Sequence, residues 1–181
     1  MSDFAPEAVA PGTTACSLSE EPIFAWFDVR GDAQDDRLLR YVRQAAGCVL
    51  PRQPNRYTRE AGYAFWLGPD QWLLALPRAT SVAVETRLLA GGDQLLAAND
   101  VTSAYCLFTV AGGLAERVLR SGTSYDLARL GAMCCAQTQL GKTQVLIWQP
   151  QAETYHLLVR RSFASYLWRW LDDAISVWEG V

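Results

Sequence analysis

The chain has 181 residues, half of them hydrophobic, and a net charge of −3 at pH 7. This length is enough for one domain with a full core, or for two small halves that share one. Acidic and basic residues are interspersed without a basic cluster, which argues against nucleic acid as a partner. No apolar stretch approaches the roughly 20 residues that span a bilayer. Because the start of the chain also lacks the basic and apolar regions of a signal peptide, we expect a cytoplasmic protein with no membrane partner.

The side chains that usually perform redox or metal chemistry are few. Five cysteines are an odd number without Cys-x-x-Cys spacing, so we expect reduced, mostly buried thiols rather than disulfides or a zinc site. His156 is the single histidine, and a hydrogen-bonded place in a strand suits it better than a metal or general-base role. The glycine-containing stretches match no phosphate-binding pattern. We therefore expect no catalytic residue, no metal site and no cofactor on this chain.

The chain divides into an arm and one domain. Residues 1–21 contain several small residues and prolines with little apolar periodicity, which predicts an extended N-terminal arm rather than a packed element. Residues 22–178 are expected to form a single α+β domain made of two halves, 22–98 and 99–178.

The first half begins with a strand at about residues 23–29 and a helix at about 35–46, which has an apolar stripe behind acidic residues in its first turn. The residues from 51 to 59 are expected to form a loop. A second helix is expected at about 80–90, where two glycines end it.

Between these helices, residues 65–76 have the pattern of two apolar aromatic strands joined by a tight turn. The turn, residues 68–71, reads Gly-Pro-Asp-Gln, and each of its first three residues favours a turn for its own reason: free backbone angles, a preset φ and a capping carboxylate. A hairpin follows, with Trp66 and Trp72 on opposite arms.

The pattern then restarts. Phe108 follows Phe27 by 81 residues within similar strand segments, and Leu157 follows Leu74 by 83 residues in a second pair of similar segments, each of which leads into a helix. This near-constant offset indicates an internal duplication. Two such units cover each other if they are related by pseudo-two-fold symmetry.

After the strand at Phe108, the second half has a predicted helix at about 113–120 and then three strands, one more than follow the first helix of the first half. These strands lie at about residues 133–140, 143–149 and 154–160. The fold class is therefore α+β, with duplicated strand–helix–strand–strand–helix units.

The final helix carries the features that favour a partner interface. Ser162 is a plausible N-cap for it. Five residues form one apolar stripe at helical spacing, which we expect to be core: Phe163, Leu167, Trp170, Leu171 and Ala174. Trp168 lies roughly 120° from the centre of this stripe at about 100° per residue, and Trp178 follows in the tail. We expect Trp168 and Trp178 to be interface residues.

Several short segments, in this order and spacing, carry a family resemblance over roughly residues 22–175. They are Phe27-Asp28-Val29-Arg30-Gly31, Leu50-Pro51, the hairpin from Trp66 to Leu74, Asp100-Val101-Thr102, Tyr125-Asp126-Leu127, Cys135-Ala136-Gln137-Thr138 and Arg161-Ser162-Phe163-Ala164. Together they resemble the gamma subunit of heterotetrameric sarcosine oxidase. The resemblance implies a fold similar to the folate-binding domain of the aminomethyltransferases.

The resemblance also implies a function. The chain would be an accessory, non-catalytic subunit that stabilises the interface of the large subunits in an assembly with alpha, beta and delta chains. That assembly oxidatively demethylates sarcosine to glycine, with formaldehyde or methylene-tetrahydrofolate and hydrogen peroxide as co-products. FAD, FMN, NAD and tetrahydrofolate would be held by the larger subunits, and zinc by the smallest.

Three alternatives remain open at this point. In the first alternative, the assembly acts on another N-methyl amino acid, such as N-methylglutamate. In the second, the chain is a scaffold of unrelated function. In the third alternative the chain is a stand-alone folate-binding module. Folate recognition needs a carboxylate for the pterin, an aromatic face and basic groups for the glutamate tail. The available candidates are Tyr125, Asp126, Arg160 and Arg161.

Overall fold

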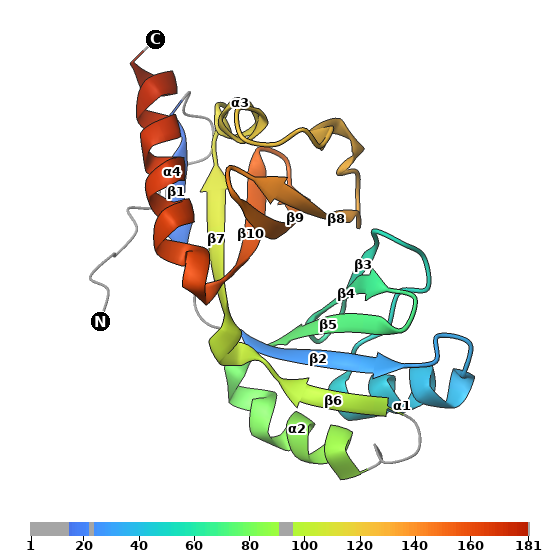
Figure 1. The fold of residues 1–181 in the computed structure, drawn as a ribbon. Coiled ribbons are helices and arrows are strands. Elements are labelled where there is room, and N and C mark those ends of the chain that lie inside the picture. The colour runs from blue at the N-terminus through green and yellow to red at the C-terminus, as the bar shows by residue number, and fades with distance from the viewer. Residues whose placement is uncertain (1–14, 22–23, 91–95, 181) are drawn as a thin grey trace. The chain divides into compact units, whose positions relative to one another are not determined.

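The computed structural model describes residues 15–21, 24–90 and 96–180, which belong to two compact units. We call Ile23–Ser103 the inserted unit, and Met1–Pro22 with Ala104–Val181 the split unit, because its chain is interrupted by the other. Each unit has an antiparallel sheet with helices packed on it (Figure 1). No helix in the described part of the chain is long and apolar enough to cross a membrane.

The inserted unit has a five-stranded sheet in the order β3-β4-β5-β2-β6. Its two helices contribute buried side chains, among them Leu38 and Leu88, to the core on one face of this sheet. The strands are β2 (Ala25–Gly31), β3 (Tyr57–Arg59), β4 (Tyr63–Gly68), β5 (Gln71–Leu76) and β6 (Leu96–Asp100), and the helices are α1 (Asp36–Ala46) and α2 (Ser81–Ala90).

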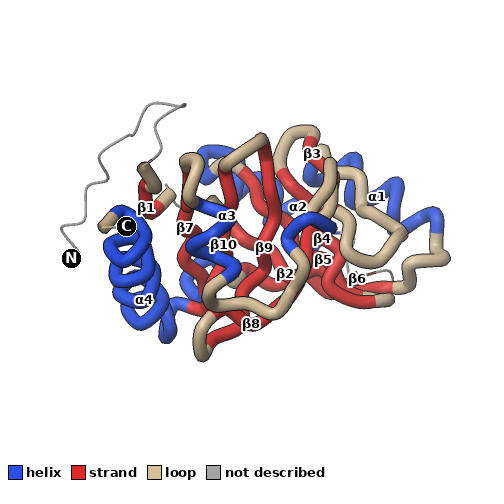
Figure 2. The backbone as a smooth tube through the Cα atoms, turned by 90° about the horizontal axis from the view of Figure 1, so that it is seen from above, coloured by secondary structure: helices blue, strands red, loops and turns tan. Residues whose placement is uncertain are grey.

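The split unit has its own five-stranded sheet in the order β1-β7-β10-β9-β8 and its own core. Figures 1 and 2 show helix α4 beside β1 and β7. The strands are β1 (Ser17–Glu20), β7 (Tyr105–Ala111), β8 (Cys135–Leu140), β9 (Thr143–Gln151) and β10 (Thr154–Arg160), and the helices are α3 (Ala115–Arg120) and α4 (Arg161–Glu179).

The predicted duplication is confirmed at the level of topology. Read from one edge, β3-β4-β5-β2-β6 corresponds strand by strand to β8-β9-β10-β7-β1. The residues that revealed the repeat also pair with each other, because Phe27 lies opposite Leu74 and Phe108 lies opposite Leu157. The α+β fold class is therefore correct, and the repeated segments are the central strands of the two sheets.

The predicted hairpin and first helix are also present. Trp66 of β4 lies opposite Trp72 of β5 across the turn. Helix α1 begins after Asp35, whose carboxylate accepts from the backbone N–H of Arg37 at 2.8 Å, and it ends at Gly47, which has φ of 67°. A left-handed residue of this kind is a common helix terminator, and glycine adopts it without strain.

Three strands differ from the predictions. At the described end of the predicted arm, Ser17–Glu20 form the strand β1 and pair with β7, whereas residues 1–14 lie outside the described part. The predicted loop from 51 to 59 ends in the short strand β3, so the second half has no additional strand. Strand β6 was not predicted. All three are short strands at sheet edges, where apolar alternation is weakest.

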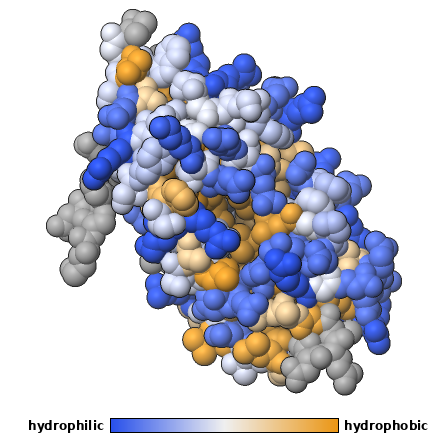
Figure 3. All heavy atoms as spheres, in the orientation of Figure 1, coloured by the Kyte–Doolittle hydropathy of each residue, from blue (hydrophilic) through white to orange (hydrophobic). Residues whose placement is uncertain are grey.

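Helices α2 and α4 both leave large apolar side chains exposed. In α2, Val84 and Leu88 are buried, whereas Val82 is 75% exposed and Leu89 is 54% exposed. Apolar surface is visible over α2 in the space-filling view (Figure 3). In α4, Phe163 is 47% exposed and Val177 is 65% exposed, while three tryptophans pack partly against the core.

Candidate functional site

Helix α4 begins directly where β10 ends. Arg160 is both the last strand residue and the N-cap of the helix, and its side chain makes no capping hydrogen bond. Ser162, the predicted N-cap, therefore lies inside the first turn. Because no loop separates the two elements, the direction of β10 fixes where the side chains of α4 point.

The buried stripe of α4 differs from the prediction by about one residue. Leu167, Leu171 and Ile175 are buried, but Phe163, which was expected to be core, is 47% exposed. The stripe is thus rotated toward Trp168, which packs partly against the core. The indole of Trp168 meets the ring of Phe108 edge to face, with centroids 5.3 Å apart. Such a pair stabilises packing beyond the area that it buries.

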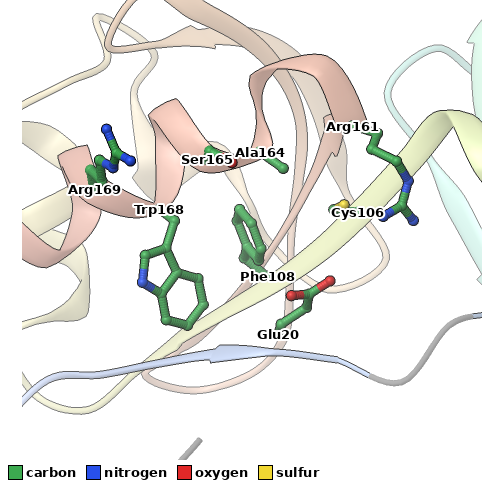
Figure 4. A pocket seen from close by; sticks show the side chains of 8 residues that line it. All are labelled: Glu20, Cys106, Phe108, Arg161, Ala164, Ser165, Trp168 and Arg169. Carbon is green, nitrogen blue, oxygen red and sulfur yellow. The ribbon is translucent and has the colours of Figure 1, made fainter. Parts of the chain in front are cut away.

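A pocket of about 240 Å³ opens beside this aromatic pair (Figure 4). It lies between the first three turns of α4 and the strands β1 and β7. Glu20 of β1 lies opposite Phe108 of β7 in the strand register, so both side chains are on the face that α4 covers. The pocket is lined by Glu20, Cys106, Phe108, Arg161, Ala164, Ser165, Trp168 and Arg169.

The pocket has an apolar floor and charges of both signs. Burial is the main cause that raises the pKa of the Cys106 thiol. The charge of Arg161 lowers this pKa to a smaller extent, and the charge of Glu20 raises it. The thiol is therefore protonated at neutral pH and is a poor nucleophile. The guanidinium of Arg161 donates to the carbonyl oxygen of Tyr105 at 3.0 Å, which holds it beside the pocket. This arrangement suits binding rather than covalent chemistry.

The second interface candidate, Trp178, lies elsewhere on α4. The guanidinium of Arg117 on α3 stacks over its ring at 4.8 Å from the centroid. Trp178 also packs partly against the core of the split unit. This contact joins the end of α4 to α3, so the structure gives Trp178 a role within the unit and places it outside the pocket.

The four folate candidates form two local groups. Asp126 accepts from the backbone N–H of Ala128 at 3.2 Å and caps a short 3-10 helix, the structural role that competes with ligand binding. The pKa of the neighbouring Tyr125 is raised, mainly by burial. The guanidinium of Arg160 stacks over the Tyr105 ring, 4.7 Å from the ring centroid. Arg161 contacts the backbone carbonyl of the same tyrosine. The pocket that includes Arg161 does not include Tyr125 or Asp126, so it does not gather the groups that folate requires.

His156 lies in β10, opposite Trp148 of β9, with ring centroids 5.0 Å apart. This agrees with its predicted place in a strand. In the described residues, no group of three histidine, cysteine, aspartate or glutamate side chains is arranged to hold a metal ion.

The five cysteines are free thiols, as predicted. Burial raises the pKa of Cys48 to about 11 and that of Cys135 to about 12, which keeps both protonated near neutral pH. Cys134 is half-buried, whereas its neighbour Cys135 is buried in β8.

From the sequence, Trp168 was an interface candidate and Arg161 a folate candidate, whereas the other residues of the pocket were not site candidates. Ser165 and Arg169 were detectable in principle, because they follow Arg161 by four and eight residues and so share its side of the helix. Glu20 was not detectable, because its place depends on the pairing of β1 with a strand far along the chain.

Several of the family-like segments have structural roles. The Asp100 carboxylate accepts from the backbone N–H of Thr102 at 2.7 Å, and the Thr102 hydroxyl accepts from the N–H of Trp26 at 2.9 Å. Through the Thr102 bond, the segment that follows β6 stays attached to β2 after the strand pairing ends. The segment at Asp126 is a cap, and the segment at Arg161 starts α4. Structure, rather than chemistry, accounts for these residue types.

Comparison with solved structures first defines the class. Over 87% of this chain and 45% of the other, the fold matches aminomethyltransferase T of the glycine cleavage system from Bartonella henselae, with a TM-score of 0.62 at 14% identity. At this identity the match shows the fold alone. The chain therefore has the aminomethyltransferase-like α+β fold that its sequence predicted.

More specific similarities define the family. The model of the sarcosine oxidase gamma subunit family matches residues 30–177. The sarcosine oxidase subunit gamma of Corynebacterium sp. (strain P-1) is 30% identical over 94% of this chain and 86% of its own length. That of an Arthrobacter species is 28% identical over 73% of this chain and 66% of its own length. The chain belongs to the sarcosine oxidase gamma subunit family.

A solved structure agrees with this assignment. A chain of the heterotetrameric sarcosine oxidase from Corynebacterium sp. U-96, in complex with pyrrole 2-carboxylate, matches with a TM-score of 0.80 and 26% identity. The match covers 91% of this chain and 86% of that one. A stand-alone folate-binding module is not favoured, because these matches point to gamma subunits.

Proposed function

We propose that this chain is the gamma subunit of a heterotetrameric sarcosine oxidase and that it acts there as a non-catalytic, structural subunit. The observation that carries the proposal is the match of nearly the whole fold to a chain of such an enzyme. The partners are the alpha, beta and delta subunits. The assembly oxidises sarcosine to glycine, and the one-carbon unit leaves as formaldehyde or as methylene-tetrahydrofolate while hydrogen peroxide forms.

The chemistry of the described residues supports the non-catalytic role. The buried thiols are held protonated, and Asp126 serves as a cap. The arginines that were folate candidates are engaged with Tyr105. Under this proposal the flavins, NAD, tetrahydrofolate and zinc belong to the other subunits, and this chain orders their interface. The cytoplasm is the proposed location.

The proposal is tested by co-expressing the tagged chain with the three other subunits and purifying it through the tag. We expect a complex of four chains with the visible absorbance of flavin and sarcosine-dependent release of hydrogen peroxide. A solitary, colourless chain would overturn the assignment.

The non-catalytic role has a separate test. Asp126→Ala and Arg160→Ala change exposed residues that carry the polar groups of the folate alternative. Turnover per assembled complex, with and without tetrahydrofolate, should be unchanged in both variants. A loss of turnover in a complex that still assembles would assign this chain a part in the chemistry.

A further inference from the structure

The pocket beside α4 combines the features that anchor a partner's side chain at a protein interface. Its floor is the edge-to-face pair of Phe108 and Trp168, with Cys106 and Ala164 around it. In Figure 4 these side chains converge from β7 and α4, while the Glu20 carboxylate approaches from β1. Tryptophan and arginine are the residue types most enriched at the energetic centres of interfaces.

The size of the pocket distinguishes between possible occupants. Small-molecule and cofactor sites typically enclose about 300–1,000 Å³. The pocket here measures about 240 Å³, which is below that range and suits one large apolar side chain. A protein segment that inserts a single anchor therefore fits better than a folate, a nucleotide or a flavin.

The charges around the floor define the rest of the occupant. Arg161 and Arg169 provide two guanidinium groups from α4, and Glu20 provides one carboxylate from β1, so the lining is net positive. Guanidinium groups bind carboxylates in a directional, bidentate way, and such pairs fix register at interfaces. Glu20, on the opposite side, is placed to accept an N–H from the same segment.

We infer that this pocket docks a segment of another subunit in which an aromatic or branched aliphatic side chain is adjacent to an aspartate or glutamate. The apolar side chain lies on Phe108 and Trp168, and the carboxylate binds at Arg169, at the end of the pocket away from Arg161. This inference rests on the proposed function, because it assigns one surface of the gamma subunit to its partners. It also gives Trp168 its role as an interface residue.

Two substitutions test the inference without removing a core side chain. Ser165 and Arg169 are exposed. Ser165→Trp fills the pocket, and Arg169→Glu reverses one of its positive charges. Ser162→Trp, on the same helix but outside the pocket, is the control for bulk. Arg40→Glu, an exposed residue on α1, is the control for charge.

The measurement is the dissociation constant of this chain from the complete four-chain complex, by dilution and mass measurement of single particles. Loss of an interface hot spot costs about 2 kcal/mol or more, so we expect each pocket variant to weaken binding roughly thirtyfold or more. The control variants should stay within about twofold of the parent, which is the ordinary effect of an exposed substitution. Circular dichroism melting of the isolated chains verifies that all variants fold.

A second experiment identifies the occupant. A photo-crosslinking amino acid at position 165 of the assembled complex should join to a peptide of another subunit that contains an acidic residue next to an aromatic or branched aliphatic one. The same group at position 162 should join to that peptide weakly or not at all.

The outcomes separate the two proposals. If the complex assembles, but the pocket variants bind like the controls and position 165 joins to no partner, the docking inference is wrong and the proposed function stands. A small molecule that co-purifies with the parent complex and is lost in Ser165→Trp would overturn the inference in favour of a ligand site. If no complex forms with the parent chain, both proposals fail.

Discussion

The two units of this chain build the same sheet order, but they cover it differently. In the inserted unit, α2 contributes only two aliphatic side chains, Val84 and Leu88, to the core. In the split unit, α4 is nearly twice as long, with 19 residues against 10, and it carries aromatic residues that form a pocket with β1. Duplication thus gave two equivalent scaffolds, of which the split unit carries the more specific surface.

The comparison extends to single positions. Trp72 of β5 lies opposite Val29, and Tyr155 of β10 lies opposite Val110, so the two residues occupy equivalent places in the two sheets. Both are buried, and both have a polar group with a partner: the Trp72 indole N–H donates to the Pro51 carbonyl at 2.8 Å, and the Tyr155 hydroxyl lies 3.5 Å from Glu116. The inserted unit has the larger side chain and the shorter hydrogen bond.

The largest expected effect follows from that difference. Trp72→Ala should lower the free energy of unfolding by about 4 kcal/mol, because it removes a fully buried indole and leaves the Pro51 carbonyl without its donor. Urea denaturation followed by circular dichroism measures the change. A loss below about 1 kcal/mol would mean that the inserted unit closes around the cavity, and would contradict the role given to this residue.

The second prediction concerns a contact found in the split unit, where Trp170 of α4 packs on Gly122. A Cβ atom at Gly122 would lie 2.2 Å from the indole, so Gly122→Ala should destabilise the protein by about 2 kcal/mol through overpacking. Gly131 has open space around it and serves as the matched control. Gly131→Ala should leave the melting temperature unchanged or slightly raised. Equal effects of the two substitutions would show that Trp170 moves aside.

The third prediction concerns Tyr155, the residue equivalent to Trp72, and the pH dependence of stability that it causes. Burial raises the pKa of Tyr155 from 10.0 to about 12. The unfolded chain therefore releases the phenolic proton first, and stability that is complete below pH 10 declines as the pH rises toward 12. Tyr155→Phe should cost less than about 1 kcal/mol at neutral pH, because the hydrogen bond to Glu116 is long.

Alkaline unfolding of the parent and of Tyr155→Phe measures this effect. The buried thiols also titrate in this range, but they are common to both proteins, so the difference between the two curves isolates Tyr155. Parallel curves would contradict the assignment.

The smallest expected effect is at the start of α1. The pKa of Asp35 is lowered from 3.8 to about 2, mainly by the hydrogen bond from the Arg37 side chain and then by the Arg37 backbone N–H. Its stabilising effect is present above about pH 4 and is lost as the pH falls toward 2. Asp35→Asn keeps a capping acceptor but not the charge, so its melting temperature should fall less steeply over this range. An equally steep fall would show that the charge is unimportant.

Much of the fold was predictable because its central elements have local signals. The turn at residues 68–71 specifies the hairpin by its own chemistry, and the repeat of Phe27 at Phe108 marks two strands that are equivalent in the sheets. The carboxylate of Asp35 and the left-handed Gly47 mark the two ends of α1. These signals depend on neighbouring residues, so sequence alone carries them.

The edge strands and the pocket were less predictable because they depend on distant pairing. Ser17 lies next to Ala111, 94 residues away, and its segment is polar and short. The rotation of the α4 stripe, which exposes Phe163, depends on the direct junction with β10. The helical spacing of apolar residues does not predict this rotation. Trp168 was identified as unusual by its angle on the helix, but its partners Phe108 and Glu20 come from other strands.

The position of β1 has a consequence for the order in which the protein is made. This strand precedes the inserted unit in the chain, yet its pairing partner β7 follows only after the whole inserted unit. A growing chain therefore completes the inserted unit while β1 is still without its sheet. Since domains generally fold as units during synthesis, the inserted unit should fold first, and the Glu20 side of the pocket should form only when β7 has been made.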